Sequence, residues 1–219
     1  YGYNNVEIPA ELKSSLTIAE EADRNYHREN IIGEQLVGEG FSEIMNNSLS
    51  KSSYYEGTEL NAYPWEETVK VMNPLSADLG VMRQTLLFGG LESIVRNVNR
   101  KAQNLRFFEV GNVYKYNKEK WTEESPVKAY VQDYHMALWV TGKRVQGSWA
   151  HPDEESSFYE LKAYVQNVFL RVGLSAEKLV VKESGNNIFS KAIAYETRNG
   201  RVIAEAGILA QTVRKAFDI

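Results

Sequence analysis

The stretch from Val71 to Tyr114 constrains the fold of this chain more than any other. It begins VMNPLSADLGVMRQTLLFGGLESIV and, after a polar segment, ends LRFFEVGNVY. Asn73-Pro74 is a turn signal, and Ser76 or Asp78 is suited to cap a helix that follows it. A helical repeat comes next, with one apolar face made of Leu91, Ile94, Val95 and Val98. The stretch therefore predicts a short strand, a turn, a helix and a second strand.

Two adjacent glycines, Gly89 and Gly90, stand inside this predicted helix. Each costs roughly 1 kcal/mol relative to alanine in a helix interior, so we expect the pair to interrupt the helix. One interpretation is a kink or a close contact with another part of the fold. The other is a backbone that must pass close to a partner chain or a ligand. The sequence leaves both interpretations open.

A long helix is predicted near the N-terminus. Thr17 and Glu20 form a capping-box pattern, and the helix should run to about Val37, with Gly38 in the left-handed position that ends it. Its apolar stripe consists of Ala22, Tyr26, Ile32 and Leu36. Residues 1–14, before this helix, are expected to be an extended arm.

The rest of the chain predicts strands and one more long helix. Strands are expected at 41–49, 69–72, 107–116, 134–141, 179–182, 192–197 and 202–209. The nearly all-apolar run 134–141 should be a central strand buried on both faces, followed by a loop over 142–155. A capping box at Ser157 and Glu160 begins a helix that ends at Gly173, and Asn199-Gly200 predicts a hairpin. Because helices do not alternate regularly with strands, we predict an α+β fold, an antiparallel sheet flanked by helices.

Composition excludes several classes of protein. The chain has 219 residues, a net charge of -4 and no cysteine, so disulfides, thiolate metal sites and a cysteine nucleophile are ruled out. No apolar run approaches 18 residues, which argues against a membrane span, and the cysteine count fits a cytoplasmic location. Without a basic block, the chain is a poor candidate for a principal nucleic-acid surface. It starts without methionine and ends in an apolar stretch, and we expect it to be a piece of a longer polypeptide.

Catalytic motifs are not found. The sequence has neither a Walker-type phosphate loop nor a dinucleotide glycine fingerprint, and it lacks a Gly-x-Ser-x-Gly elbow. His27, His135 and His151 do not stand at metal-ligand spacing. We expect His135, in its apolar strand, to be a hydrogen-bonded core histidine. The residues alone thus predict a soluble α+β domain with a candidate interaction surface and without a recognisable active site.

The central stretch also resembles a known family, the β subunit of bacterial phenylalanyl-tRNA synthetase. The run NPLSADLGVMRQTLLFGGLESIVRNVNR, followed by RFFEVGNVYKY, is similar to that family's signature. The matching residues are Asn73, Pro74, Ser76, Met82, Arg83, Leu86, Leu87, Gly89, Leu91, Phe107, Phe108, Glu109, Val110 and Gly111. The segments Gly40-Phe41-Ser42-Glu43 and Phe158-Tyr159-Glu160-Leu161-Lys162 resemble two further family motifs, and the resemblance covers essentially the whole chain.

This resemblance implies a class II aminoacyl-tRNA synthetase-like core that is not itself catalytic. Residues 1–14 would end the preceding domain or form a linker arm, and residues 15–219 would be the core domain, truncated at its C-terminus. In the family, an α subunit uses ATP and magnesium to attach phenylalanine to tRNA(Phe), and the β core supports it in an (αβ)2 assembly in the cytoplasm. The tRNA is held mainly by regions outside this segment. The resemblance implies no catalytic, cofactor-binding or metal-binding residue here, and it marks as subunit-interface or core-signature residues Asn73, Pro74, Arg83, Gly89, Gly90, Phe108, Glu109 and Gly111.

Some positions depart from the family pattern. A class II site needs an arginine on its second motif strand to hold the ATP α-phosphate, and Lys115 stands at the corresponding place, without the planar bidentate fork of arginine. Ile188-Phe189-Ser190-Lys191 lacks the His-Pro-Gly run that the family often carries. Two alternatives therefore stay open. One is a stand-alone small-molecule-binding or regulatory protein that reuses the fold, and the other is an active class II enzyme with unusual motifs.

Overall fold

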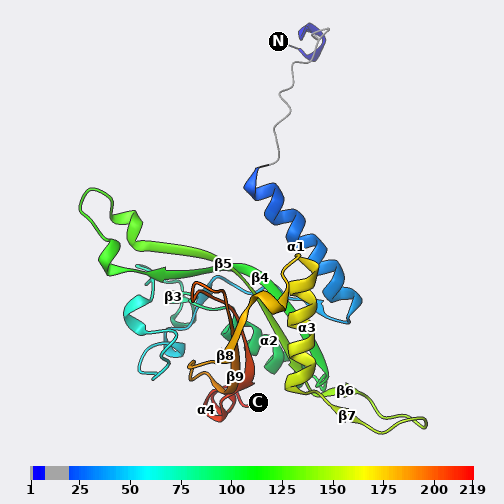
Figure 1. Cartoon of the computed structure of the whole chain (residues 1–219). Coiled ribbons are helices and arrows are strands. Elements are labelled where there is room, and N and C mark those ends of the chain that lie inside the picture. The colour runs from blue at the N-terminus through cyan, green and yellow to red at the C-terminus, as the bar shows by residue number, and fades with distance from the viewer. Residues whose placement is uncertain (1, 8–19) are drawn as a thin grey trace.

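The computed structural model describes residues 2–7 and 20–219, and it has the α+β architecture that the sequence predicts (Figure 1). The helices are α1 (Glu21–Gly38), α2 (Leu87–Val98), α3 (Phe158–Arg171) and α4 (Gln211–Ala216). The strands are β1 (Ser42–Glu43), β2 (Leu49–Ser50), β3 (Val81–Met82), β4 (Leu105–Tyr116), β5 (Tyr130–Thr141), β6 (Lys143–Val145), β7 (Glu154–Glu155), β8 (Val180–Glu183), β9 (Phe189–Glu196) and β10 (Val202–Leu209).

Two three-stranded sheets form the centre of the molecule. In one the strand order is β1-β4-β5, with β1 parallel to β4 and β4 antiparallel to β5. In the other the order is β10-β9-β8, and both pairs are antiparallel. Short pairs, β2 with β3 and β6 with β7, lie beside them. The sheets are therefore mostly antiparallel, as expected.

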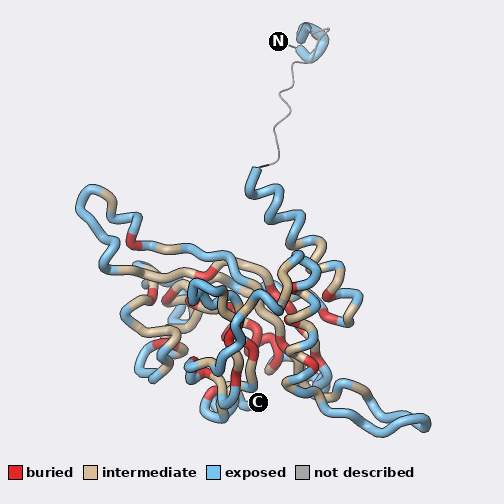
Figure 2. Tube along the Cα trace, viewed as in Figure 1, coloured by how far each residue is buried: buried red, intermediate tan, exposed pale blue. Residues whose placement is uncertain are grey.

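Buried apolar residues join these sheets through the helices. α2 packs with β4, β5 and the C-terminal segment in a cluster that includes Phe88, Leu91 and Trp139. α3 contacts both sheets, because Val168 lies in one cluster with β4 and β5, while Phe169 packs with β9 and β10 in another. The buried residues gather in the middle of the molecule, whereas the β6–β7 hairpin extends outward and is largely exposed (Figure 2).

The N-terminal helix differs from the prediction at both ends. It begins at Glu21, and the Asp23 carboxylate accepts a hydrogen bond from the Glu20 N–H at 2.8 Å. The predicted cap Thr17 lies outside the described residues, as does most of the predicted N-terminal arm. At the other end Gly40, with φ of 88°, takes the left-handed position that was predicted for Gly38. The predicted apolar stripe is only partly correct, because the first turns of α1 project from the body and expose their side chains.

The prediction for residues 41–90 is wrong in several places. The expected strand 41–49 is reduced to β1 and β2, and 69–72 makes only one isolated bridge, from Lys70 to Val81. After Pro74 the chain forms a single 3-10 turn, Ala77–Leu79, and the helix α2 starts only at Leu87. Gly89 and Gly90 therefore lie in the first turn of α2 and do not interrupt it. Tertiary hydrogen bonds of the segment around Arg83 override the local helix signal.

Three predictions for residues 130–155 are also wrong. β5 pairs with β4 along one edge only, and just Trp139 among its residues is buried, so it is not a central strand. His135 is exposed and is not a core histidine. The predicted loop 142–155 contains the β6–β7 hairpin.

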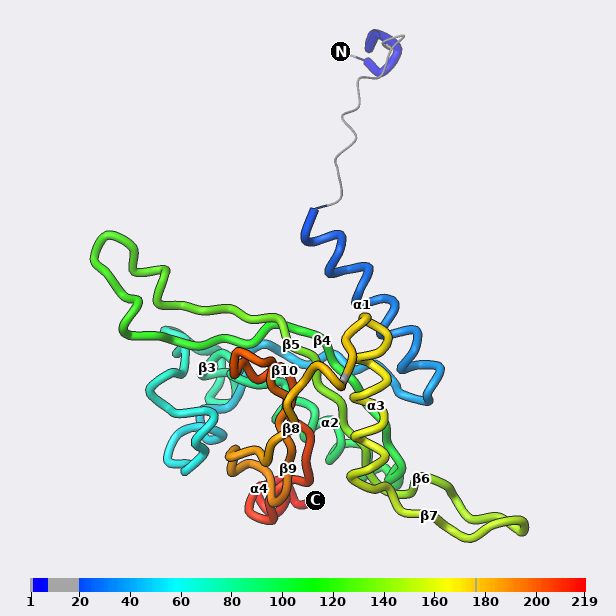
Figure 3. Tube along the Cα trace, in the orientation of Figure 1, coloured from blue at the N-terminus to red at the C-terminus, as the bar shows by residue number. Residues whose placement is uncertain are grey.

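The C-terminal third follows the sequence closely, and Figure 3 traces its path from α3 through β8, β9 and β10 to α4. The Ser157 hydroxyl accepts the Glu160 N–H at the start of α3. Gly173 and Gly200 take φ of 77° and 79°, which confirms the predicted helix end and hairpin turn. No helix in residues 2–7 or 20–219 is both long enough and apolar enough to span a membrane.

Candidate functional site

A buried ion pair lies at the centre of the signature stretch. Arg83 follows β3, and its Nη1 is 2.6 Å from Oε1 of Glu109 on β4. The two side chains are 8% and 2% exposed. Arg83 also donates from Nε to the Asn112 carbonyl at 2.9 Å and from Nη1 to the Asn46 carbonyl at 3.3 Å. Since an isolated buried charge is very costly, each group depends on the other for its place in the core.

Asn46 completes this cluster from the segment between β1 and β2. Its Nδ2 donates to Glu109 Oε2 at 2.7 Å, and its backbone N–H donates to Oε1 at 3.2 Å. Its Oδ1 accepts the Ser93 hydroxyl of α2 at 2.9 Å. We call Asn46, Arg83, Ser93 and Glu109 the Arg83 cluster. It ties β1–β2, β3, α2 and β4 together, and its polar groups are engaged with one another.

Three glycines make room for these contacts. A Cβ on Gly111 would stand 2.4 Å from Arg83 Nη2, and one on Gly89 would stand 2.9 Å from the Asn46 Cβ. A Cβ on Gly90 would stand 2.1 Å from Cζ2 of Trp139. All three distances are shorter than real Cβ contacts, so the side chains of the chain itself fill the space beside each glycine. This geometry favours the packing interpretation of the Gly89-Gly90 pair.

The other signature residues lie elsewhere. Phe108 points into a separate apolar cluster with Leu36 and Phe41. Asn73 and Pro74 are exposed on the loop before β3. The structure therefore brings five of the eight predicted residues together, with Arg83, Gly89, Glu109 and Gly111 in one place and Gly90 beside them. The other three, Asn73, Pro74 and Phe108, lie apart from this group.

Sequence reasoning missed Asn46, Ser93 and a second polar group around Gln84. Gln84 donates from Nε2 to the Thr68 hydroxyl at 2.7 Å, and its backbone N–H donates to the Tyr55 hydroxyl at 3.1 Å. Burial raises the pKa of Tyr55 to about 12. These residues attach the segment 51–68 to β3, but asparagine, serine and glutamine in loops or helices give no periodic signal that would single them out.

Lys115, which stands where the class II pattern calls for an arginine, forms an ion pair within the chain. Its Nζ is 3.1 Å from Oε2 of Glu67, and both side chains are partly exposed. Within residues 2–7 and 20–219, no three His, Asp or Glu side chains stand close enough to share a metal ion. The polar chemistry of this site consequently fits the support of a fold better than the activation of a substrate.

Comparison with solved structures defines the class of fold. Two structures of pyrrolysyl-tRNA synthetase from Desulfitobacterium hafniense superpose with TM-scores of 0.57 and 0.58 at 12% and 11% identity. Each match covers 89% of this chain and 62% of that one. The fold is thus that of a class II synthetase-like core, which confirms the predicted fold class.

Sequence comparison then shows the family. The model of the phenylalanyl tRNA synthetase beta chain CLM domain matches residues 8–219. The chain is 52% identical to a phenylalanine–tRNA ligase beta subunit of Bacteroides fragilis and 44% identical to one of Porphyromonas gingivalis, in both cases over its full length. It spans about a quarter of these relatives, 26% of each. The chain belongs to the phenylalanyl-tRNA synthetase β-chain core family, and the resemblance seen in the sequence is confirmed.

Proposed function

We propose that this chain is the structural core of the β subunit of a phenylalanine–tRNA ligase, and that it supports a catalytic α subunit without being catalytic itself. The observation that carries the proposal is the Arg83 cluster, in which Arg83 and Glu109 of the family signature form an ion pair in the core. Membership of the family over the full length of the chain supports the same role. The whole enzyme would attach phenylalanine to tRNA(Phe) with ATP and magnesium, as an (αβ)2 assembly in the cytoplasm.

The described residues do not fit a nucleotide or magnesium site of their own. An ATP α-phosphate calls for a bidentate arginine, and the corresponding Lys115 already pairs with Glu67. The described part of the chain also offers no cluster of carboxylates for magnesium. Under this proposal, ATP and magnesium would be bound by other parts of the enzyme. The alternative of a stand-alone ligand-binding or regulatory protein gains no support from the comparisons.

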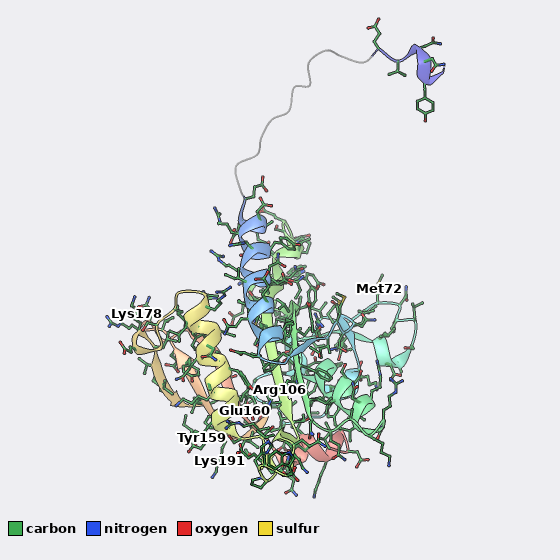
Figure 4. The ribbon with its side chains drawn as sticks, turned by 90° about the vertical axis from the view of Figure 1, so that its right-hand side faces the viewer. Met72, Arg106, Tyr159, Glu160, Lys178 and Lys191 are labelled. Carbon is green, nitrogen blue, oxygen red and sulfur yellow. The ribbon has the colours of Figure 1, made fainter. Side chains whose placement is uncertain are left out.

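The loop before β3 is the surface that we assign to the α subunit. Met72 and Leu75 flank Asn73-Pro74 and are 90% and 94% exposed. Backbone hydrogen bonds fix the base of this loop, from Val71 N to Gly80 O and from Met82 N to Val69 O, at 3.0 and 2.8 Å. Met72 lies at the edge of the molecule, far from Lys178 in Figure 4. A firmly held loop that presents two large apolar side chains to solvent is suited to bury them against a protein.

Replacing both side chains tests this assignment. The double variant Met72→Ser/Leu75→Ser of the full-length β subunit should bind the α subunit more weakly by about 3–6 kcal/mol, since burial of each of the two side chains contributes roughly 1.5–3 kcal/mol. Association can be measured by analytical ultracentrifugation of the purified subunits. Leu170→Ser is the matched control, because Leu170 is 66% exposed on α3, away from this loop. Equal affinities for the double variant and the wild type would contradict the assignment.

A further inference from the structure

The surface is hollowed at the root of the β6–β7 hairpin. One hollow of about 390 Å³ adjoins a second of about 220 Å³, and they share Asn104, Lys143 and Gln146. The remaining lining residues are Gly40, Lys101, Ala102, Gln103, Arg106, Thr141 and Arg144. Every charged residue in this described lining is a cation, and the amides of glutamine and asparagine add neutral donors. We call this the hairpin-root hollow.

The acidic side chains near this hollow do not line it, but form ion pairs with the cations that do. Asp153 pairs with Lys143, Glu154 with Arg144 at 3.8 Å, and Glu160 with Arg106 at 3.0 Å. Glu155 lies opposite Lys143 in the β6–β7 register. These ion pairs reduce the positive charge of the hollow, but each lysine and arginine has more N–H donors than one ion pair uses. Lys101, which lines the hollow, belongs to none of the ion pairs between described residues.

Arg106 keeps unused donors at this place. Its Nη2 makes the bonds to Glu160 Oε1, at 3.0 Å, and to the Arg144 carbonyl, at 3.1 Å. Its Nε is buried without a partner in the described chain. Figure 4 shows Arg106 and Glu160 side by side. The Arg106 side chain is 25% exposed and lines the hollow, so its guanidinium is suited to donate hydrogen bonds to the oxygens of a phosphate.

A fully exposed tryptophan stands at the tip of the same hairpin. Trp149 is 99% exposed, and the hairpin that carries it projects from the body (Figure 1). The tip is held in shape by a hydrogen bond from the Ser148 N–H to the His151 carbonyl at 2.9 Å and by the Asp153 carboxylate, which accepts the Gly147 N–H. A hollow lined by cations at the root of the hairpin and an exposed aromatic ring at its tip can together hold the phosphates and one unpaired base of an extended single strand.

We propose that the β6–β7 hairpin and the hairpin-root hollow bind a single-stranded segment of RNA, with phosphates on Lys101 and Arg106 and a base stacked on Trp149. The inference rests on the proposed function, whose substrate is a tRNA, and adds to it an RNA contact within this domain. The low net charge of the chain fits a local contact that is secondary to a larger RNA-binding surface elsewhere. A partner protein that buries Trp149 in an apolar pocket fits the polar, cationic surroundings less well.

The test uses the full-length β subunit in complex with its α subunit and a fluorescein-labelled tRNA(Phe) transcript as the probe. Trp149→Ala should raise Kd on the order of tenfold, because stacking of one base is worth about 1–3 kcal/mol. Lys101→Ala should raise it less and should reduce the slope of log Kd against log salt concentration by about 0.7–0.9. Fluorescence anisotropy measures both effects, and phenylalanine-dependent pyrophosphate exchange should not change.

Matched controls separate the possible outcomes. Trp121→Ala removes a tryptophan that is 50% exposed on the hairpin that joins β4 to β5, and Lys178→Ala removes an exposed lysine near β8. Neither should alter tRNA affinity. Wild-type affinity in both Trp149→Ala and Lys101→Ala would overturn the inference, and so would loss of the αβ complex in Trp149→Ala, which would show a protein contact. If the wild-type subunits do not associate, the proposed function itself fails, and this inference fails with it.

Discussion

Replacing Arg83 with alanine is the sharpest perturbation of the family signature. The change removes the partner of Glu109, which is only 2% exposed, and leaves the carbonyls of Asn46 and Asn112 without the hydrogen bonds that Arg83 gives them. Glu109 would keep two donors from Asn46, at 2.7 and 3.2 Å. Its charge would nevertheless be buried without a counter-charge.

The expected loss of stability follows from this burial. Removing one member of a buried ion pair costs about 3–5 kcal/mol, which is a large part of the roughly 5–15 kcal/mol that keeps a typical domain folded. Arg83→Lys should cost less than Arg83→Ala, because lysine keeps a positive charge beside Glu109. It should still be less stable than the wild type, because lysine lacks the fork that reaches both Glu109 and Asn112. We therefore predict that the free energy of unfolding decreases from the wild type to Arg83→Lys and again to Arg83→Ala.

Urea unfolding of the chain, followed by far-ultraviolet circular dichroism, measures these free energies. Lys182→Ala is the control, because it breaks an exposed ion pair with Glu196 and such pairs contribute at most about 1 kcal/mol. If Arg83→Ala were no less stable than Lys182→Ala, the Arg83 cluster would not hold the fold together, and our account of the signature would be refuted.

Two further predictions concern stability. Gly90→Ala should destabilise the chain by about 1–3 kcal/mol through overpacking, because its Cβ would stand 2.1 Å from a ring carbon of Trp139; an unchanged urea midpoint would contradict this. Burial raises the pKa of Tyr55 to about 12, so above pH 10 the unfolded chain loses this proton before the folded chain does. Stability should consequently fall between pH 10 and 12 by up to about 1.4 kcal/mol per pH unit from this residue, and Tyr55→Phe should show a shallower fall in unfolding scans at pH 9, 10 and 11. Identical pH dependence in the two proteins would rule out this role of Tyr55.

The elements that the sequence predicts correctly are those with strong local signals. α3 has a clear apolar stripe, a serine cap and a terminal glycine, and all three appear in the structure. The β9–β10 hairpin follows from alternating segments around Asn199-Gly200. Here local preference and tertiary packing agree, so the sequence suffices.

The errors occur where tertiary contacts decide the structure. After Asn73-Pro74 the local signal favours a helix, but the chain returns to pair with β2 and to place Arg83 against Glu109. In β5 the apolar run 134–141 has the composition of a central strand, yet the strand lies at the edge of its sheet. Hydrophobicity alone does not report how many neighbours a strand has.

The candidate site was only partly visible in the sequence. Resemblance to the family marked Arg83, Glu109 and Gly111, and the structure brings them together in one cluster. Resemblance could not separate these core residues from Asn73 and Pro74, which are exposed. Asn46 went unnoticed because a single loop asparagine becomes informative only when its partners, 47 and 63 residues away in sequence, are known.

Reconstitution of the enzyme from separate full-length subunits tests the central claim most directly. Each subunit would be assayed alone and in a mixture for phenylalanine-dependent exchange of pyrophosphate into ATP. We predict that the β subunit alone is inactive, and that the mixture forms a stable complex in which activity appears. Exchange activity in the β subunit alone, or failure of the two subunits to associate, would contradict the account.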